Sequence, residues 1–252
     1  MATEVLWGAD SASAARTSSA ANPYLGEHLV LMSASALFRG LTPKECVEII
    51  SCGRARTFMR DQLLYAQGQP VNNMILLQSG SVKHTQLGAN GNEVLLRISG
   101  SGDALTVDME LPSCNHSCSA RAMEQCKALV WDYARLQALV VQYPQIRKNI
   151  GQILSGNLKE LEERFREVAT EKVAKRLALI LLRLLKQVGK PSKEGIEVFL
   201  SREELGQMTG TTLFTISRIL SSWAEDGLVV PRRMAVLISD KKGLELVSNQ
   251  EG

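Results

Sequence analysis

The chain has 252 residues and a formal net charge of +3 at pH 7, and 45% of its residues are hydrophobic and 22% charged. This length suits two domains, and this composition excludes a largely disordered chain. No stretch approaches the roughly 18 consecutive apolar residues that a membrane-spanning helix needs, so no membrane partner is expected. Residues 1–24 are rich in Ala and Ser and lack the apolar core of a secretory signal, which predicts a disordered tail on a cytoplasmic protein.

The first ordered part is predicted to be a helical segment followed by short strands. Helical spacing of apolar residues runs from Leu29 to Ser51, and Thr42-Pro43 is typical of a helix start. After Gly53, short apolar stretches alternate with turn residues, which predicts an antiparallel sandwich or roll over residues 25–143. Asn90-Gly91 is a good hairpin turn because both residues tolerate a positive φ. The expected strands are residues 63–65, 74–77, 82–87, 94–98, 117–123 and 128–132.

A long helical pattern begins near Tyr143 and continues to Val188. Within residues 144–168, apolar residues recur at spacings of four and three and form a heptad seam with charged residues around it. Such a seam is expected to pack against the same helix of a second chain, so this helix is a candidate for dimerisation. The alternative is that the seam packs on its own sheet domain. The seam consists of Leu154, Leu158, Leu161, Phe165 and Val168.

Residues 169–252 are predicted to form a second domain with a winged helix-turn-helix. An apolar helix at 172–188 supplies its core, and a strand follows at 196–200. Ser201 and Glu204 match the capping-box pattern of a helix that ends at Gly210. A second helix then runs from Thr211 or Thr212 to about Asp226 and buries Ile216, Ile219, Leu220 and Trp223. Two strands between residues 228 and 238 complete a wing whose turn carries two arginines.

The outward side of this second helix is a candidate DNA-binding surface. A helix fits the major groove, where base pairs present distinguishable donors and acceptors. Threonine hydroxyls near the helix start suit phosphate contacts, Arg218 suits a guanine edge, and the wing arginines suit phosphates. The alternative is a winged domain used only for protein contacts. The candidate residues are Thr212, Leu213, Phe214, Thr215, Ser217, Arg218, Arg232 and Arg233.

The order of these elements resembles the Crp/Fnr family of bacterial transcription regulators. The resemblance is carried by Gly80-Ser81-Val82, by the long helix, and by the stretches Leu200–Leu205 and Thr215–Leu220. It implies an α+β fold, with an N-terminal antiparallel β-roll like that of cyclic-nucleotide-binding domains, a dimerisation helix and a C-terminal winged helix-turn-helix. It also implies a homodimer that senses a signal in the roll and repositions two recognition helices on a palindromic double-stranded DNA site. RNA polymerase is a further candidate partner.

The sequence departs from the family pattern at two sites, the base-reading positions and the stretch that binds a cyclic nucleotide. By resemblance, Leu213, Phe214 and Arg218 occupy the three base-reading positions, and the first two are apolar where many members are polar. We therefore expect an altered half-site, with contact to a thymine methyl group as one option. The stretch from Gly102 to Ala120 lacks the Gly-Glu pair of cyclic-nucleotide binders and has His116 where their phosphate-binding Arg stands. A cyclic nucleotide is therefore not the expected ligand.

Cysteines near this stretch are candidate effector or metal ligands. The chain has five cysteines, an odd number that does not predict a disulfide framework. Three thiols and one imidazole in a short region suit zinc, an iron–sulfur cluster or haem, and such thiols also suit a switchable disulfide. Redox or gas sensing is the resulting expectation, and the alternative for Cys126 is a small buried core thiol. His84 shows no partner pattern and is expected at the surface. The candidates are Cys114, His116, Cys118 and Cys126.

No motif of an enzyme is present in the sequence. Paired catalytic carboxylates, a phosphate-binding Gly-rich loop and a nucleophile with its base are all missing, and Gly88–Gly91 is explained as a hairpin turn. The rival to a transcription regulator is a ligand- or redox-binding module whose winged domain serves as a protein adaptor.

Overall fold

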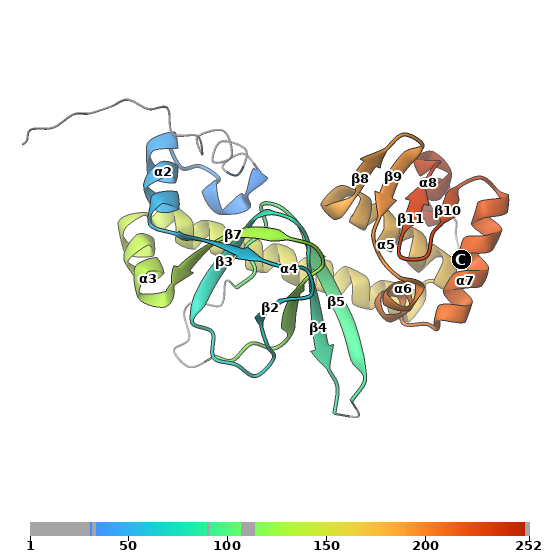
Figure 1. Ribbon diagram of the computed structural model, residues 1–252, viewed down its shortest axis with the longest axis horizontal. Coiled ribbons are helices and arrows are strands. Elements are labelled where there is room, and N and C mark those ends of the chain that lie inside the picture. The colour runs from blue at the N-terminus through green and yellow to red at the C-terminus, as the bar shows by residue number, and fades with distance from the viewer. Residues whose placement is uncertain (1–30, 32–33, 90, 107–113, 250–252) are drawn as a thin grey trace, which may run out of the picture.

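The computed structural model describes residues 31, 34–89, 91–106 and 114–249. The expected tail at 1–24 lies outside the described residues, as does Asn90 of the expected hairpin turn. A β-rich domain, a long helix and a helix-rich C-terminal domain follow one another along the chain (Figure 1). No helix among the described residues is long and apolar enough to cross a membrane.

The β-rich domain is a roll of two antiparallel sheets. One sheet has the strand order β1-β7-β3 and the other β2-β6-β4-β5. The six predicted strands are confirmed as β2 to β7, whereas β1 was not predicted because four of its five residues are exposed and carry no alternating apolar pattern. The strands are β1 (Arg54–Phe58), β2 (Leu63–Tyr65), β3 (Asn73–Ser79), β4 (Val82–Leu87), β5 (Glu93–Ser99), β6 (Ser119–Ala122) and β7 (Cys126–Asp132).

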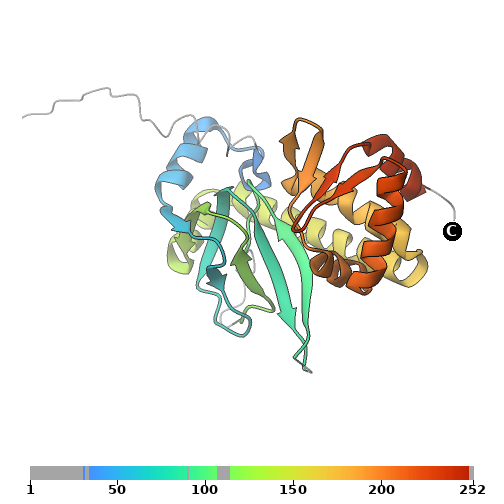
Figure 2. The same cartoon turned by 45° about the vertical axis from the view of Figure 1, so that its right-hand side comes forward.

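Strands β4 and β5 form the predicted hairpin. Val82 pairs with Ser99 at its base and Leu87 with Glu93 near its tip, and the register shifts between His84 and Thr85. Gly91 adopts the positive φ that the turn requires. In Figure 2 the tip of this hairpin projects beyond the rest of the roll.

Short helices pack on the outer face of the first sheet. The predicted helical stretch at the start of the chain is divided into the 3₁₀-helix η1 (Ala36–Phe38) and α2 (Pro43–Ser51), and α2 begins with a capping box at Thr42. The helix α3 (Tyr133–Gln142) lies before the expected onset at Tyr143, so that prediction of the boundary is wrong. Its start has a local signal, since the Asp132 carboxylate accepts a hydrogen bond from the backbone N–H of Arg135.

The helix α4 (Pro144–Thr170) is 27 residues long, which corresponds to about 40 Å. Its first turns belong to the core of the roll, because Ile146, Asn149 and Ile150 are buried there. The Asn149 side-chain amide donates to the carbonyl oxygens of Leu37 and Arg39 at 2.7 and 2.8 Å. The remaining turns run from the roll toward the C-terminal domain (Figure 1).

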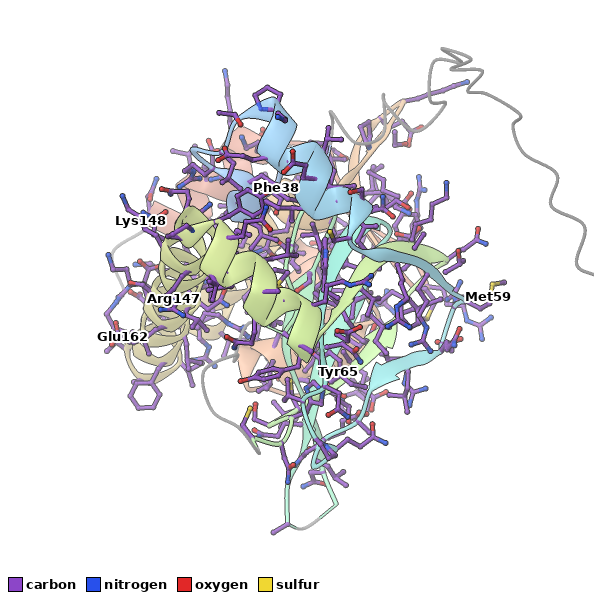
Figure 3. The ribbon with its side chains drawn as sticks, turned by 90° about the vertical axis from the view of Figure 1, so that its left-hand side faces the viewer. Phe38, Met59, Tyr65, Arg147, Lys148 and Glu162 are labelled. Atoms are coloured by element: carbon purple, nitrogen blue, oxygen red, sulfur yellow. The ribbon has the colours of Figure 1, made fainter. Side chains whose placement is uncertain are left out.

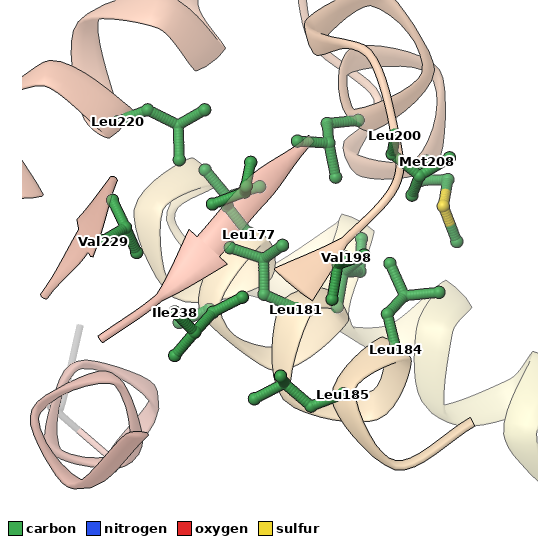
Figure 4. Close-up of a cluster of buried hydrophobic side chains, with 14 of the residues drawn as sticks. Leu177, Leu181, Leu184, Leu185, Val198, Leu200, Met208, Leu220, Val229 and Ile238 are labelled. Atoms are coloured by element: carbon green, nitrogen blue, oxygen red, sulfur yellow. The ribbon is translucent and has the colours of Figure 1, made fainter. Parts of the chain in front are cut away.

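The C-terminal domain is built on one apolar helix, α5 (Val173–Val188). Its leucines pack against side chains from the sheet and from the two following helices (Figure 4). The predicted two-stranded wing is part of a larger sheet with the order β10-β11-β9-β8. The elements are β8 (Lys190–Ser192), β9 (Gly195–Val198), α6 (Arg202–Thr209), α7 (Leu213–Glu225), β10 (Val229–Pro231), β11 (Val236–Ile238) and α8 (Lys241–Asn249).

The roll and the C-terminal domain are in direct contact through the β4–β5 hairpin. Leu95 and Ile98 of β5 are buried in the same cluster as the leucines of α5. Beside this apolar contact, the Lys83 ammonium of β4 lies 2.9 Å from the Glu204 carboxylate of α6, and both side chains are largely buried. Burial alone would raise the pKa of Glu204, but the backbone N–H of Ser201 and the Lys83 ammonium together lower it.

The pair Lys83–Glu204 allows a thermodynamic test of this contact. Lys83→Met keeps the length of the side chain, and Glu204→Gln keeps an acceptor for the backbone of Ser201, so each variant mainly removes one charge. We expect each single variant to lower the free energy of unfolding at pH 7. The loss in the double variant should be smaller than the sum of the two single losses by about 1 kcal/mol. The loss in Glu204→Gln should vanish as the pH falls through the lowered pKa of Glu204, because the wild-type carboxylate is then protonated too. Urea unfolding at several pH values measures both effects, and additive losses would contradict a direct pair.

Candidate nucleic-acid interface

The first helix of the predicted helix-turn-helix is fixed at both ends by local contacts. At its start, the Ser201 hydroxyl accepts from the backbone N–H of Glu204, and the Glu204 carboxylate accepts from that of Ser201. At its end, Gly210 caps α6 with a φ of +67°. A Cβ on Gly206 would lie 2.9 Å from the carbonyl oxygen of Thr211, so this glycine lets the turn approach α6 closely.

The second helix, α7, begins at the N-cap Thr212 as predicted. The Thr212 hydroxyl accepts a hydrogen bond from the backbone N–H of Thr215 at 3.3 Å. Ile216, Leu220 and Trp223 are buried against α5 and the sheet, and Ile219 is half-buried. This buried side leaves the opposite side of α7 facing away from the domain.

Most of the predicted DNA-contacting side chains on α7 are exposed. Phe214 is 77% exposed and Leu213 41% exposed, and Arg218 is exposed one turn further along the helix. Thr215 and Ser217 are half-buried. The first turn of α7 has no acidic residue, so no carboxylate there opposes the approach of a phosphate to the free backbone N–H groups.

The two arginines of the wing differ in their surroundings. Both lie in the turn between β10 and β11 and both are exposed. Arg232 pairs with Glu197 of β9 at 2.8 Å and lies 3.8 Å from Glu194. Sequence reasoning missed this pair, because its partners are separated by more than thirty residues and meet only through the pairing of β9 with β11.

The seam on α4 is exposed along its whole length. Its side chains are 38% to 76% exposed, and the largest value belongs to Phe165. Figure 3 shows Lys148 and Glu162 of the same helix at the outer side of the molecule, away from Tyr65 in the roll. The roll of the same chain therefore leaves the seam uncovered. The alternative prediction, that the seam packs on its own sheet domain, is wrong. The seam residues are Leu154, Leu158, Leu161, Phe165 and Val168.

The interior of the roll contains a buried histidine. The expectation that His84 lies at the surface is wrong, because the side chain is fully buried. Its Nδ1 lies 3.2 Å from the Tyr65 hydroxyl, and its Nε2 lies 2.9 Å from the Ser99 hydroxyl. Burial, and then the charge of Arg97, keep the pKa of His84 well below its usual range. The sequence contained a signal for this burial, because alternate residues of a strand face the same side and His84 therefore shares the side of the apolar Val82.

The predicted effector residues are divided between two places. His116 stacks on the Tyr65 ring at 3.9 Å, and the Cys118 sulfur lies 4.0 Å from Nδ1 of His84. Cys126 instead lies against the turn before β4, where its buried thiol donates to the carbonyl oxygen of Ser81 and burial raises its pKa. Cys114 is half-buried, and its carbonyl oxygen accepts from the backbone N–H of Val71. In the part of the chain that the structure describes, no three His, Cys, Asp or Glu side chains are grouped closely enough to hold a metal ion.

A cavity of about 160 Å³ lies between β5 and α4. Its polar lining includes the guanidinium of Arg97, the carboxyls of Asp103 and Glu160, and the amide of Asn157. Burial raises the pKa of Asp103, while the backbone N–H of Gly100 opposes the rise. The described lining residues thus include two acidic residues and one basic residue.

Known proteins share both parts of this architecture. A family model of the Crp-like helix-turn-helix domain matches residues 175–247, and a model of the cyclic nucleotide-binding domain matches residues 55–143. The Cyclic AMP receptor protein of Thermus thermophilus is 28% identical over 198 residues, which cover 79% of this chain and 89% of the relative. Electron transport regulator A of Shewanella oneidensis is 22% identical over 197 residues, or 77% of this chain and 78% of that one.

Solved structures show the same fold. The c-di-GMP responsive global regulator CLP of Xanthomonas campestris has a TM-score of 0.68 at 23% identity, covering 79% of this chain and all of the other. A mutant of CooA from Carboxydothermus hydrogenoformans has a TM-score of 0.63 at 25% identity, covering 80% of this chain and 90% of the other.

The buried His84 predicts a specific dependence of stability on pH. The folded chain holds this imidazole neutral, whereas the unfolded chain protonates it below about pH 6.5. The unfolded state therefore binds the extra proton, and the free energy of unfolding should fall as the pH is lowered from 7 to 5, by up to about 1.4 kcal/mol per pH unit from this group. In His84→Gln this contribution disappears, so its stability profile should be flatter. Urea unfolding followed by circular dichroism measures both profiles, and equal slopes would show that His84 does not titrate in this way.

Proposed function

The chain belongs to the Crp/Fnr family of transcription regulators, and from this premise we propose that it acts as a homodimer on a palindromic DNA site under control of a signal sensed in the roll. Its helix-turn-helix is a DNA-binding domain of the Crp type. The observation that carries the proposed assembly is the exposed apolar seam of α4. A row of leucines and a phenylalanine in water is unfavourable, and a second copy of the helix removes it from water.

The seam also supports a palindromic target. Two copies of α4 related by a two-fold axis would place the two α7 helices symmetrically, because each α4 is held in its own roll by Asn149 and its neighbours. Symmetric dimers of helix-turn-helix domains bind half-sites about 34 Å apart, one turn of DNA. The proposed site is therefore an inverted repeat.

Each proposed DNA-contacting residue has a role that follows from its position. Thr212 and Thr215 at the start of α7, with Ser217, are suited to phosphates, and Arg218 is suited to a guanine edge. Arg233 is suited to a phosphate beside the groove. Arg232 can serve in the same way because its side chain remains 43% exposed beside Glu197.

The contact between β4 and α6 supports a route from the roll to the DNA-binding domain. Neighbouring residues of β4 face opposite sides, so His84 lies inside the roll while Lys83 reaches Glu204. A change around the Tyr65–His84–Cys118 group would displace β4, and with it the carboxylate that caps α6. A second route is the packing of the two α4 helices, which sets the spacing of the recognition helices.

The features of the roll support a signal other than a cyclic nucleotide. The cavity beside α4 is smaller than the roughly 300 Å³ of typical ligand pockets, and its two carboxyls disfavour a phosphate. The proposed signal is redox or gas sensing through Cys114, His116 and Cys118 by thiol chemistry, because the described residues contain no group of three side chains close enough to hold a metal ion. The buried position of Cys126 supports a structural role for that thiol.

The known relatives are named as regulators, which supports a role in transcription without catalysis. DNA as the partner favours the cytoplasm of a bacterium as the location. RNA polymerase is the further partner that a transcription regulator of this kind would contact.

Substitution within the seam tests the homodimer. In Leu161→Glu, a carboxylate would face its own copy across the proposed two-fold interface, so we expect a monomer of 27.6 kDa with an unchanged circular dichroism spectrum. The matched control is Gln152→Glu, which adds the same group to an exposed position of α4 outside the seam. Sedimentation equilibrium distinguishes the two states. A monomeric wild-type chain, or a dimeric Leu161→Glu variant, would contradict the interface.

Two arginine variants separate base reading from phosphate contact. We expect Arg218→Ala to weaken binding to the preferred site by about 10-fold or more and to relax the preference at one base pair. Arg233→Ala should weaken binding to all duplexes alike and reduce the slope of log affinity against log salt by about one. Fluorescence anisotropy on the preferred and a scrambled duplex measures both. Equal losses on the two duplexes in Arg218→Ala would argue against base reading by this residue.

A further inference from the structure

A largely exposed side chain of α7 is apolar, although it lies on the surface assigned to DNA. Phe214 is 77% exposed, next to Leu213 in the first turn, whereas the other exposed side chains around it are polar or basic. We propose that Phe214 determines the half-site by contacting the C5-methyl group of a thymine, close to the guanine bound by Arg218. This inference rests on the proposed function, because it requires that α7 enters the major groove.

The chemistry of the phenyl ring restricts what it can recognise in the groove. The ring neither donates nor accepts a conventional hydrogen bond, so it cannot read guanine, adenine or cytosine through their polar edges. The major groove presents one apolar group, the methyl of thymine. Contact with that methyl removes both surfaces from water, and the phosphates offer no comparable partner. Thymine is therefore the base that Phe214 can select.

The geometry of α7 places the two reading side chains close together. Phe214 and Arg218 are separated by one helical turn and lie on the same face, opposite the buried Ile216 and Leu220. Four residues of helix span about 6 Å, and successive base pairs are about 3.4 Å apart. The selected thymine should therefore lie within about two base pairs of the guanine that Arg218 contacts.

Leu213 is less suited to this role. Leu213 is only 41% exposed. Its backbone nitrogen would lie 3.4 Å from a Cβ built on Gly206, so the backbone of Leu213 is close to α6. Its side chain therefore starts nearer to the body of the domain than that of Phe214. Leu213→Ala thus provides a matched control, which removes an apolar side chain from the neighbouring position.

The test removes single methyl groups from the DNA. A preferred duplex is first selected from a random pool with the full-length wild-type chain. Each thymine of one half-site is then replaced singly by deoxyuridine, which lacks only the C5-methyl, and each guanine by 7-deazaguanine, which lacks the N7 acceptor. Affinities of the wild type, Phe214→Ala, Leu213→Ala and Arg218→Ala are measured for every duplex by fluorescence anisotropy.

We expect one deoxyuridine position that weakens wild-type binding about fourfold, the amount that burial of one methyl group supplies. The same replacement should leave the affinity of Phe214→Ala unchanged and should still weaken Leu213→Ala. One 7-deazaguanine replacement should weaken binding of the wild type but not of Arg218→Ala. That guanine should lie within about two base pairs of the selected thymine.

Two sets of results would overturn the inference at different levels. If no thymine methyl affects binding, or if the effect persists in Phe214→Ala, the assignment of Phe214 is wrong while DNA binding stands. If the selection enriches no duplex, the proposed function itself fails and this inference fails with it.

Discussion

The position of α4 is the constraint on which the rest of the molecule depends. Its first turns are part of the core of the roll, and the Asn149 amide donates to two carbonyl oxygens, one within η1 and one directly after it. A buried amide without these partners would be costly, so the helix has one well-defined direction as it leaves the roll. The exposed seam and the start of α5 both follow from that direction. One buried polar contact near Pro144 thus helps to determine where the DNA-binding domain lies.

The second connection between the domains is the β4–β5 hairpin. Leu95 and Ile98 share a core with α5, and Lys83 reaches the carboxylate that also caps α6. Because the same strand carries His84 on its inner side, one face of β4 lies inside the roll and the other contacts the DNA-binding domain. In the proposed mechanism, a movement of β4 inside the roll would reach the start of the helix-turn-helix directly through the Lys83–Glu204 pair.

Local signals made much of this architecture predictable from the sequence. The caps at Thr42, Ser201 and Gly210 depend on neighbours within four residues, and the heptad seam depends on one helix, so a single sequence contains them. Features that depend on pairing between distant segments were not predictable in this way. The ion pair of Arg232 follows from the pairing of β9 with β11, and the partners of His84 follow from the closure of the roll, although alternation on β4 gave a local signal for its burial. Cys118 and Cys126 are close in sequence, but they lie beside different neighbours.

We propose that two chains, joined through α4, place two α7 helices on one symmetric DNA site. Native mass spectrometry of the full-length chain with a selected duplex, combined with hydroxyl-radical footprinting of the same complex, tests it most directly. We expect two chains per duplex and two protected half-sites about 34 Å apart, related by two-fold symmetry. One chain per duplex, with a single protected half-site at saturation, would contradict it.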